Sequence, residues 1–447
     1  MRKFTFLFTL IFIFTSAFAF KAEAVTFTPN LQIYSDAAYM INMKTGDVIF
    51  KKNENKSLHP ASLTKLMTAI ILLEKFKDNP DALKTTYVSA PSSVYIEFYG
   101  QNVSTADIRP NEKVNYLELL YALLLPSSCE AGNIIAYNIG GHNIESFVAM
   151  MNEKAKELGA TNTHFANAHG LHDASQVTSA RDIAIITQYA MSLPKFTEIA
   201  STTTHTMEAT SVHPNGTFLR HTNSMLFSGT EYYYKYAKGI KTGTTEEAGR
   251  CLVSIASKDG VDYLIVTMNA PMTDKTGKNV YYNCLDHKTL YEWAYNKLAY
   301  TQVLDNKKEL GDITVLYGKD ADSVNYRAKE SFTPLWQKDL KPEVAIKENA
   351  YVEDSIIAPI KEGDKVGVLE LVYNGEVIFK TDLLATTTVE RNGFKYRLSV
   401  AGQFFSSKMF KLAFFICIAI VVIYTFLFIV VFRKRKRHKF KPKKIKR

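Results

Sequence analysis

Cysteine is scarce in this sequence, with four in 447 residues. Cys417 falls in the most apolar segment, and the other three, Cys129, Cys251 and Cys284, are too sparse to form a disulfide framework. A single bridge between two of these three fits the sequence, which does not choose the pair. Internal repeats are absent, and no stretch before residue 433 has low complexity. With 47% apolar and 22% charged residues, the composition excludes a mainly disordered, collagen-like or disulfide-dense protein.

The body of the chain lacks the positive charge that the whole chain carries. The net charge is +10, but residues 433–447 contain eleven Lys and Arg and no acid, and residues 1–24 carry a net +2. The stretch 25–432 therefore has a net charge of −3. Because this stretch is slightly acidic, we expect no nucleic-acid partner.

The N-terminus has the pattern of a removable secretory signal. Arg2 and Lys3 precede an apolar run over residues 4–14, and small-residue cleavage patterns end at Ala19 and Ala24. The run is shorter than the ~20 residues that a membrane span needs, which disfavours a retained anchor. We therefore predict a signal peptide over 1–24.

The C-terminus has the pattern of a membrane anchor. Residues 412–432 contain no charge, and a helix over this segment would be about 31 Å long, which matches one bilayer core. The basic tail 433–447 follows directly, and an excess of Lys and Arg marks the cytoplasmic side of a span. The sequence thus predicts a single-pass protein of the cell membrane, with a cytoplasmic tail and an extracytoplasmic body.

Residues 25–300 have the pattern of one sizeable mixed domain, and the length of the chain allows further domains. Strand-turn-strand patterns occur at 38–50 and 250–269. By contrast, 62–73 and 115–125 are apolar on nearly every side, which is typical of helices buried within a domain.

The pattern changes after this region to short strands and turns, so we expect a small all-β module over 309–390. Its clearest hairpin spans 365–380 and turns at Asn374-Gly375, a pair that suits the positive-φ positions of a type I′ turn. Residues 391–411 form a linker to the membrane span.

Ser62 and Lys65 are the first candidate catalytic pair. Their spacing at the start of a helix places a hydroxyl and an amine on one face, where the amine can take the hydroxyl proton if burial or positive neighbours lower its pKa. The alternative for Ser62 is an ordinary helix N-cap. Ser192 and Lys195 have the same spacing, but Pro194 lies between them and a loop is adjacent, so Ser62 is the better candidate.

The tripeptide Lys-Thr-Gly occurs three times, beginning at Lys44, Lys241 and Lys275. The first fits a hairpin turn and the third fits a loop. Only Lys241 leads toward the predicted strand 250–257, so this copy can lie at a sheet edge, where a substrate peptide could add as an extra strand. There Lys241 could attract a carboxylate, and Gly243 would leave room for close backbone approach.

The third element is Ser127-Ser128-Cys129, which lies between two predicted buried helices. A loop in that position is a stable platform for a hydroxyl. Taken alone, Ser127 would be interpreted as a helix cap.

Together these elements resemble the three motifs of the low-molecular-mass penicillin-binding proteins, specifically the D-alanyl-D-alanine carboxypeptidases of serine peptidase family S11. The β module resembles the family's C-terminal domain, and the similarity spans roughly residues 30–390. The resemblance implies an α+β fold with a β-lactamase/DD-peptidase-like catalytic domain, an antiparallel sheet with flanking helices, over 25–300. The motifs are Ser62-x-x-Lys65, Ser127-x-Cys129 and Lys241-Thr242-Gly243, with further similarity at 60–68, 167–171, 179–182 and 239–243.

The resemblance also implies the chemistry. Ser62 would attack the carbonyl between the two terminal D-alanines of a peptidoglycan stem peptide, with Lys65 as base and Ser127 passing a proton to the leaving amine. β-Lactams would acylate the same serine. Water would release the acyl-enzyme, so neither a cofactor nor a metal is needed. The substrate-binding residues would be Cys129, Lys241, Thr242, Gly243 and Thr244, with the backbone N–H groups of Ser62 and Thr244 holding the oxyanion.

Two departures from the family pattern stand out. The family usually has Asn at the position of Cys129, and a thiol offers weaker hydrogen bonds than an amide, so the balance between hydrolysis and transfer to another amine could change. The family also tends to place an Arg beyond the Lys-Thr-Gly strand to bind the substrate carboxylate. Between Ala270 and Asp286 the sequence offers only Lys275 and Lys278, which leaves that role unassigned.

Three alternatives stay open at this point. A wall-binding or penicillin-binding protein with impaired catalysis would keep the fold, and Cys129 is the only residue that favours it. A β-lactamase would need a further carboxylate base to discharge the acyl-enzyme, and the sequence points to none. A zinc peptidase using His169 and His172 would rest on a lone His-x-x-His in a glycine-containing loop, which is a weak metal signal.

Overall fold

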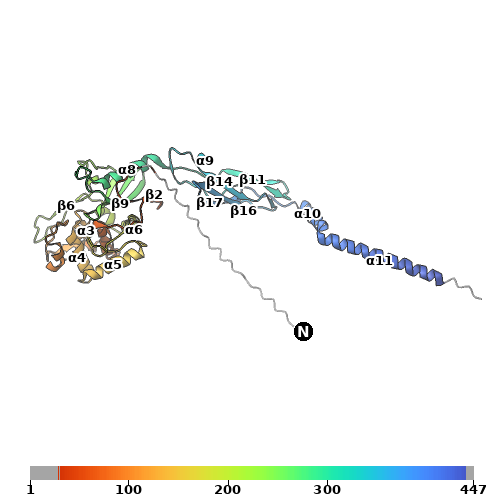
Figure 1. Ribbon diagram of the computed structural model, residues 1–447, viewed down its shortest axis with the longest axis horizontal. Helices are drawn as coiled ribbons and strands as arrows, with labels where there is room; N and C mark the ends of the chain where they lie inside the picture. The colour runs from red at the N-terminus through yellow and green to blue at the C-terminus, as the bar shows by residue number, and fades with distance from the viewer. Residues whose placement is uncertain (1–28, 30, 439–447) are drawn as a thin grey trace, which may run out of the picture. The chain divides into compact units, whose positions relative to one another are not determined.

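The computed structural model describes residue 29 and residues 31–438, with side chains as far as Arg433 (Figure 1). The predicted signal peptide 1–24 lies outside the described residues, as does the end of the basic tail, 439–447. Two compact units are present in the described part of the chain. One extends to Thr301 and includes Pro334–Lys341, and the other comprises Gln302–Thr333 and the residues from Pro342 onward.

The first unit is built on a five-stranded antiparallel sheet with the strand order β2-β1-β9-β8-β7. Alternate side chains of β9 point to opposite faces. Leu264 and Val266 join the main core with the helices, whereas Thr267 contacts His287 of α8 (Tyr282–Lys297) on the other face. The sheet is therefore covered on both sides, and β7 forms one of its edges. The strands are β1 (Ala37–Asn42), β2 (Val48–Lys52), β7 (Ala237–Thr245), β8 (Gly249–Lys258) and β9 (Val261–Ala270).

The helices of this unit cluster around α1 (Lys65–Lys75), whose residues from Lys65 to Leu73 are all buried. Helices α3, α4, α5 and α6 all pack against it. The apolar runs of the sequence therefore form central helices, as predicted. The other helices are α2 (Ala82–Thr85), α3 (Tyr116–Leu124), α4 (Cys129–Ile139), α5 (Ile144–Glu157), α6 (Ala180–Ser192), α7 (Phe196–Ala200) and α8 (Tyr282–Lys297), with 3-10 helices η1 (Ala61–Thr64), η2 (Ser92–Phe98) and η3 (Ser224–Leu226).

Three short strand pairs complete this unit. β3 pairs with β4, β5 with β6, and β10 with β13, all antiparallel. Their bounds are β3 (Tyr87–Val88), β4 (Val114–Asn115), β5 (Thr204–Thr206), β6 (Phe218–Arg220), β10 (Leu298–Tyr300) and β13 (Leu335–Gln337).

The second unit contains a six-stranded sheet with the order β14-β16-β17-β12-β11-β15. The predicted hairpin is present as β16 and β17, and Asn374 and Gly375 both have positive φ, at 51° and 87°, as a type I′ turn requires. The module is all-β apart from one short helix, α9 (Pro342–Ala345). Its strands are β11 (Glu309–Leu316), β12 (Ser323–Ala328), β14 (Lys347–Val352), β15 (Ser355–Ile357), β16 (Lys365–Tyr373) and β17 (Glu376–Ala385).

Two helices follow the module. The predicted linker 391–411 contains α10 (Gly393–Ser406), so most of this connection is helical. The predicted span 412–432 lies within α11 (Lys408–His438), of which Lys408–Arg433 is long and apolar enough to cross a membrane. Membrane anchoring through this helix is the role that its length and composition suggest.

Candidate active site

Ser62 lies in the turn that precedes α1. The structure differs here from the predicted helix start: Ser62 belongs to the 3-10 helix η1, and α1 begins at Lys65. The N-cap of α1 is Thr64, so the N-cap interpretation of Ser62 is wrong. The tighter turn still brings the pair together, because Lys65 Nζ lies 3.1 Å from Ser62 Oγ.

The amine of Lys65 is completely buried. Besides Ser62 Oγ, Nζ contacts Cys129 Sγ at 3.6 Å and donates to the main-chain carbonyl of His169. Burial lowers the pKa of Lys65, because a charged amine loses its hydration there. A neutral amine with two N–H donors can donate to His169 and Cys129 while its lone pair accepts from the Ser62 hydroxyl.

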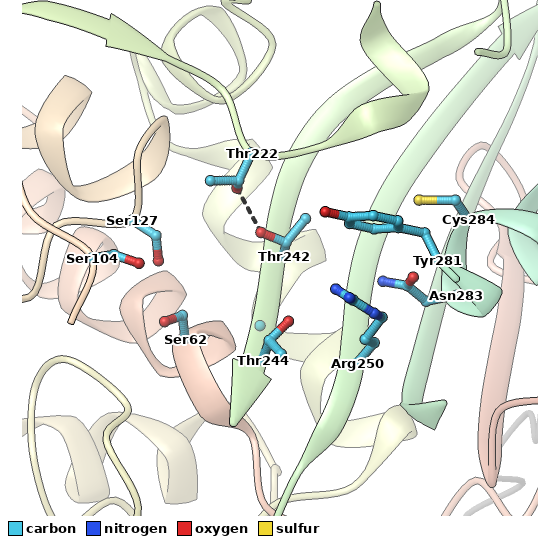
Figure 2. Close-up of a pocket in the computed structure, with 11 residues that line it drawn as sticks. Ser62, Ser104, Ser127, Thr222, Thr242, Thr244, Arg250, Tyr281, Asn283 and Cys284 are labelled. Carbon is cyan, nitrogen blue, oxygen red and sulfur yellow. Dashed lines mark hydrogen bonds between the residues drawn. The ribbon is translucent and has the colours of Figure 1, made fainter. Parts of the chain in front are cut away.

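Ser127 and Cys129 lie at the turn between α3 and α4. Ser128 is the N-cap of α4, with its Oγ accepting from Ala131 N at 3.0 Å, so the cap interpretation of Ser127 is wrong. Within the described residues the buried Oγ of Ser127 has no hydrogen-bond partner, and it points into a pocket (Figure 2). The backbone of Ser127 has a positive φ of 69°, and this local distortion turns its side chain toward the pocket.

The copy of Lys-Thr-Gly at Lys241 lies on β7, the sheet edge, as predicted. A Cβ at Gly243 would lie 3.0 Å from Pro60 O and 3.2 Å from Ser62 N, so glycine allows the strand to approach the serine turn. Lys241 is fully buried, with Nζ donating to Thr242 O at 3.0 Å. Burial, together with the nearby charge of Lys65, holds the pKa of Lys241 well below its usual range.

The repeated motifs elsewhere have structural roles. The Lys44 copy forms the turn between β1 and β2, and the Lys275 copy forms an exposed loop stabilised by Asp274. Lys195 is paired with Glu198 on the surface, and Ser192 Oγ donates to Tyr189 O. The copies that the sequence context favours, Ser62-Lys65 and the one at Lys241, are the ones that the structure brings close together.

A pocket of about 250 Å³ joins these elements (Figure 2). Lys65, Cys129 and Lys241 are buried behind its wall rather than lining it. The other five predicted site residues line the pocket directly, namely Ser62, Ser127, Thr242, Gly243 and Thr244. The lining residues are Ser62, Ser104, Ser127, Thr222, Thr242, Gly243, Thr244, Arg250, Tyr281, Asn283 and Cys284.

Arg250 is a pocket residue that the sequence did not indicate. It lies on β8, where it pairs with Thr244 of β7 on one side and Ala270 of β9 on the other, and only 8% of the residue is exposed. Its guanidinium donates to Asn279 Oδ1 and lies 4.0 Å from the Tyr281 ring centre. Among the described residues Arg250 has no ion-pair partner, and its buried Nε has no acceptor. The sequence analysis places the expected cation between Ala270 and Asp286. Arg250 instead lies beside Ala270 through the pairing of β8 with β9, a register that the sequence does not reveal.

The other sequence candidates occupy different places. Lys275 and Lys278 are exposed in the loop before α8. His169 is buried against Glu97, whereas His172 lies 3.8 Å from Glu247. In the described part of the chain, no group of three or more His, Cys, Asp or Glu side chains is arranged to hold a metal. The cysteines Cys129, Cys251, Cys284 and Cys417 are all free thiols.

An antiparallel sheet flanked by helices, with a Ser–Lys pair beside its edge strand, is the arrangement of the penicillin-binding serine peptidases. Residues 22–272 match the family model for peptidase S11, D-alanyl-D-alanine carboxypeptidase, and residues 299–391 match the model for the C-terminal domain of penicillin-binding protein 5. The chain belongs to peptidase family S11 and is a serine-type D-Ala-D-Ala carboxypeptidase. The predicted family, enzyme class and fold class are confirmed.

Individual relatives agree with this assignment. The D-alanyl-D-alanine carboxypeptidase DacF of Bacillus subtilis is 27% identical over 383 residues, covering 84% of this chain and 91% of the relative. The enzyme of Streptomyces sp. strain K15 is 31% identical over 251 residues, 54% of this chain and 82% of the relative. Among solved structures, the Francisella tularensis carboxypeptidase DacD has the same fold, with a TM-score of 0.62 at 21% identity over 85% of this chain and 99% of that one.

Proposed function

We propose that Ser62 is the nucleophile and Lys65 the base of this carboxypeptidase. The observation that carries the proposal is the fully buried Nζ of Lys65, 3.1 Å from Ser62 Oγ. Lys65 takes the hydroxyl proton as Oγ bonds to the carbonyl carbon between the two terminal D-alanines of a stem peptide. The C–N bond then breaks, the amine of the last D-alanine leaves with a proton relayed by Ser127, and water hydrolyses the acyl-serine.

The developing oxyanion is held by the backbone N–H groups of Ser62 and Thr244. The close approach of β7 to η1 at Gly243 supports this role, because it brings the two segments side by side. One such donor is typically worth about 2.7–4 kcal/mol of the barrier. The peptide itself adds along the free edge of β7.

The far end of the pocket recognises the substrate's C-terminal carboxylate. Lys241 and Thr242 orient it, and Thr242 is itself held by Thr222, with the two hydroxyl oxygens 2.5 Å apart. We assign Arg250 to the same role, since a buried cation with a free N–H and no acidic partner in a pocket favours an anionic ligand.

Replacing Arg250 by Leu is expected to lower kcat/KM for a peptide ending in D-Ala-D-Ala by roughly tenfold to a hundredfold, because a hydrogen bond to a charged group is lost. Amidation of the peptide's C-terminus should lower the rate of the wild-type enzyme far more than that of the variant. Steady-state D-alanine release measures both. Arg220→Leu is the matched control, since Arg220 is exposed and lies over the Phe227 ring. Equal discrimination against the amide in both enzymes would remove Arg250 from the site.

Replacing Cys129 by Asn is expected to leave the protein folded and acylable while changing the ratio of hydrolysis to aminolysis. Sγ lies 3.6 Å from Lys65 Nζ, and an amide there would make stronger hydrogen bonds with the amine. Product analysis with an added D-amino acid acceptor measures the ratio. Complete inactivation would mean that the thiol has a role outside this mechanism.

Labelling with a fluorescent penicillin, followed by assay with a D-Ala-D-Ala pentapeptide, tests the proposed function. A stable adduct on Ser62 together with D-alanine release supports it. Neither label nor release would indicate the catalytically impaired alternative, and rapid penicillin turnover would indicate a β-lactamase.

We also propose the domain boundaries of the chain and its orientation in the membrane. Residues 1–24 act as the signal peptide, 25–300 as the catalytic domain and 309–390 as a spacer module, with 391–411 connecting it to the span 412–432. The basic residues 433–447 lie in the cytoplasm and the catalytic domain lies outside, which the excess of positive charge after the span supports. Protease added to intact cells should remove the catalytic domain and spare the tail, and the reverse pattern would refute this orientation.

A further inference from the structure

The carbonyl of His169 is the strongest hydrogen-bond acceptor of Lys65. The other contacts of Nζ are a thiol, which is a weak acceptor, and the reacting hydroxyl of Ser62. The direction of the amine therefore depends on where this carbonyl lies. His169 is 104 residues from Lys65 in the sequence, so the contact depends on the loop that carries it.

The backbone of that loop is secured by its neighbours. Asn167 Oδ1 accepts from His169 N at 3.3 Å and from Gly170 N at 2.7 Å. Gly170 has a φ of +88°, and a Cβ there would collide with the carbonyl of Ala61, so the loop lies directly against the serine turn. These contacts fix the backbone around His169. The orientation of its imidazole ring depends on a separate contact.

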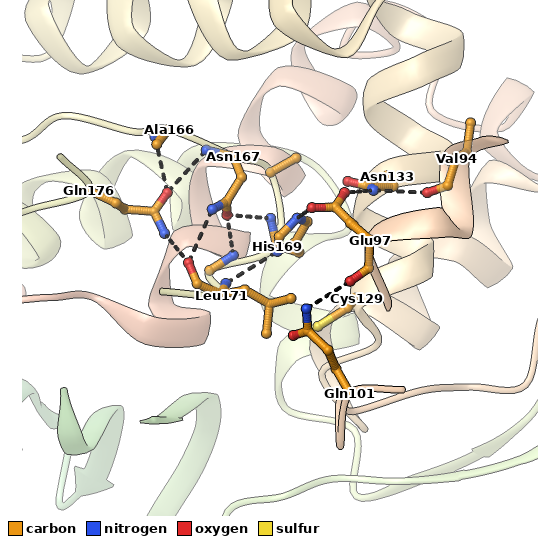
Figure 3. Close-up of polar contacts among 12 residues, drawn as sticks. Val94, Glu97, Gln101, Cys129, Asn133, Ala166, Asn167, His169, Leu171 and Gln176 are labelled. Carbon is orange, nitrogen blue, oxygen red and sulfur yellow. Dashed lines mark hydrogen bonds and ion pairs between the residues drawn. The ribbon is translucent and has the colours of Figure 1, made fainter. Parts of the chain in front are cut away.

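Glu97 holds that ring (Figure 3). Its Oε2 lies 3.2 Å from His169 Nε2, and the rings of Phe98 and His169 form a T-shaped pair with 5.2 Å between their centres. Since Nδ1 of His169 accepts from Leu171 N at 3.2 Å, the ring proton is on Nε2 and donates to the carboxylate. Burial lowers the pKa of His169, so the ring is neutral and the pair is one charge-assisted hydrogen bond.

Glu97 is itself fixed to the helical core. Asn133 is fully buried on α4, and its Nδ2 donates to Glu97 Oε1 at 2.5 Å and to Val94 O at 3.1 Å. Each carboxylate oxygen thus accepts from a different donor, one on α4 and one on the loop of His169. Hydrogen bonds thus link α4 to Glu97, Glu97 to the ring of His169, and the main-chain carbonyl of His169 to Lys65.

We propose that Glu97 is a positioning residue for the base: it fixes the tautomer and orientation of His169, and the His169 carbonyl then keeps the Lys65 amine directed at Ser62. Glu97 does not touch the substrate in this proposal. The inference rests on the proposed roles of Ser62 and Lys65, and it adds that their geometry is set by a carboxylate on η2.

The experiment measures acylation by penicillin under stopped flow, separating the rate constant of acylation from the dissociation constant of the initial complex. The variants are Glu97→Ala, Glu97→Gln and the control Gln101→Ala. The Gln101 side chain donates to the main-chain oxygen of Glu97 at 2.9 Å, not to its carboxylate. We expect Glu97→Ala to lower the acylation rate constant about tenfold to a hundredfold, the usual effect of small misplacement of a reacting group, with little change in the dissociation constant.

Glu97→Gln preserves size and folding, but its amide has one acceptor oxygen for the two donors that the carboxylate binds, His169 Nε2 and Asn133 Nδ2. Its acylation rate constant should therefore fall between those of the wild type and Glu97→Ala. Gln101→Ala should react like the wild type. Wild-type acylation rates in both Glu97 variants would overturn the proposal, as would a loss confined to the dissociation constant or shared equally by Gln101→Ala. Labelling of Ser62 in the wild type would still support the proposed function in those cases, whereas an unlabelled wild type would refute both.

Discussion

Ser62→Ala is expected to abolish the covalent penicillin adduct and to reduce D-alanine release by about 10⁴-fold or more, as for other serine hydrolases that lose their nucleophile. Only one oxygen is removed, from a partly exposed side chain in η1, so the fold and its thermal stability should remain close to those of the wild type. Mass spectrometry of the penicillin-treated protein measures the adduct directly.

The control for this prediction is Ser192→Ala. Ser192 has the same spacing to a lysine, yet its hydroxyl donates to Tyr189 O and its lysine pairs with Glu198 on the surface. This variant should retain full labelling. An adduct on Ser62→Ala at wild-type stoichiometry would show that another residue is the nucleophile, and would remove the basis of the mechanism.

Lys65→Met is expected to lower the acylation rate by about 10²- to 10⁴-fold, the usual contribution of a general base. Methionine has a similar length and keeps the buried volume filled, so the loss isolates the amine. Burst kinetics with penicillin measure it, and Lys195→Met on the surface provides the control. A variant that acylates at the wild-type rate would show that Ser62 loses its proton to another group.

The same lysine determines the sign of the pH dependence. Burial lowers the pKa of Lys65, and only its neutral form accepts the serine proton, so acylation should increase with pH and level off below the ~10.4 of a free lysine. In Lys65→Met the rising limb should be lost.

Local patterns predicted much of this protein because they involve residues close in sequence. The turn at Asn374-Gly375 needs only two positive-φ positions, and the Ser62 and Lys65 side chains meet because they are three residues apart in one turn. The type of helical turn at Ser62 was harder to predict from the sequence. This turn is the 3-10 helix η1 rather than the start of α1, because contacts with β7 and with the loop at Gly170 shape it.

The sequence by itself determined the order of the motifs, the strand pairs and apolar helices, and the position of the apolar C-terminal segment, since each depends on neighbouring residues or on composition. The tertiary structure alone decided that Arg250 enters the pocket and that Glu97 reaches Lys65 through His169. The register between β8 and β9 and the packing of η2 on α4 bring these residues together. Such contacts join distant parts of the chain, and the packing of the whole domain, rather than any local pattern, selects them.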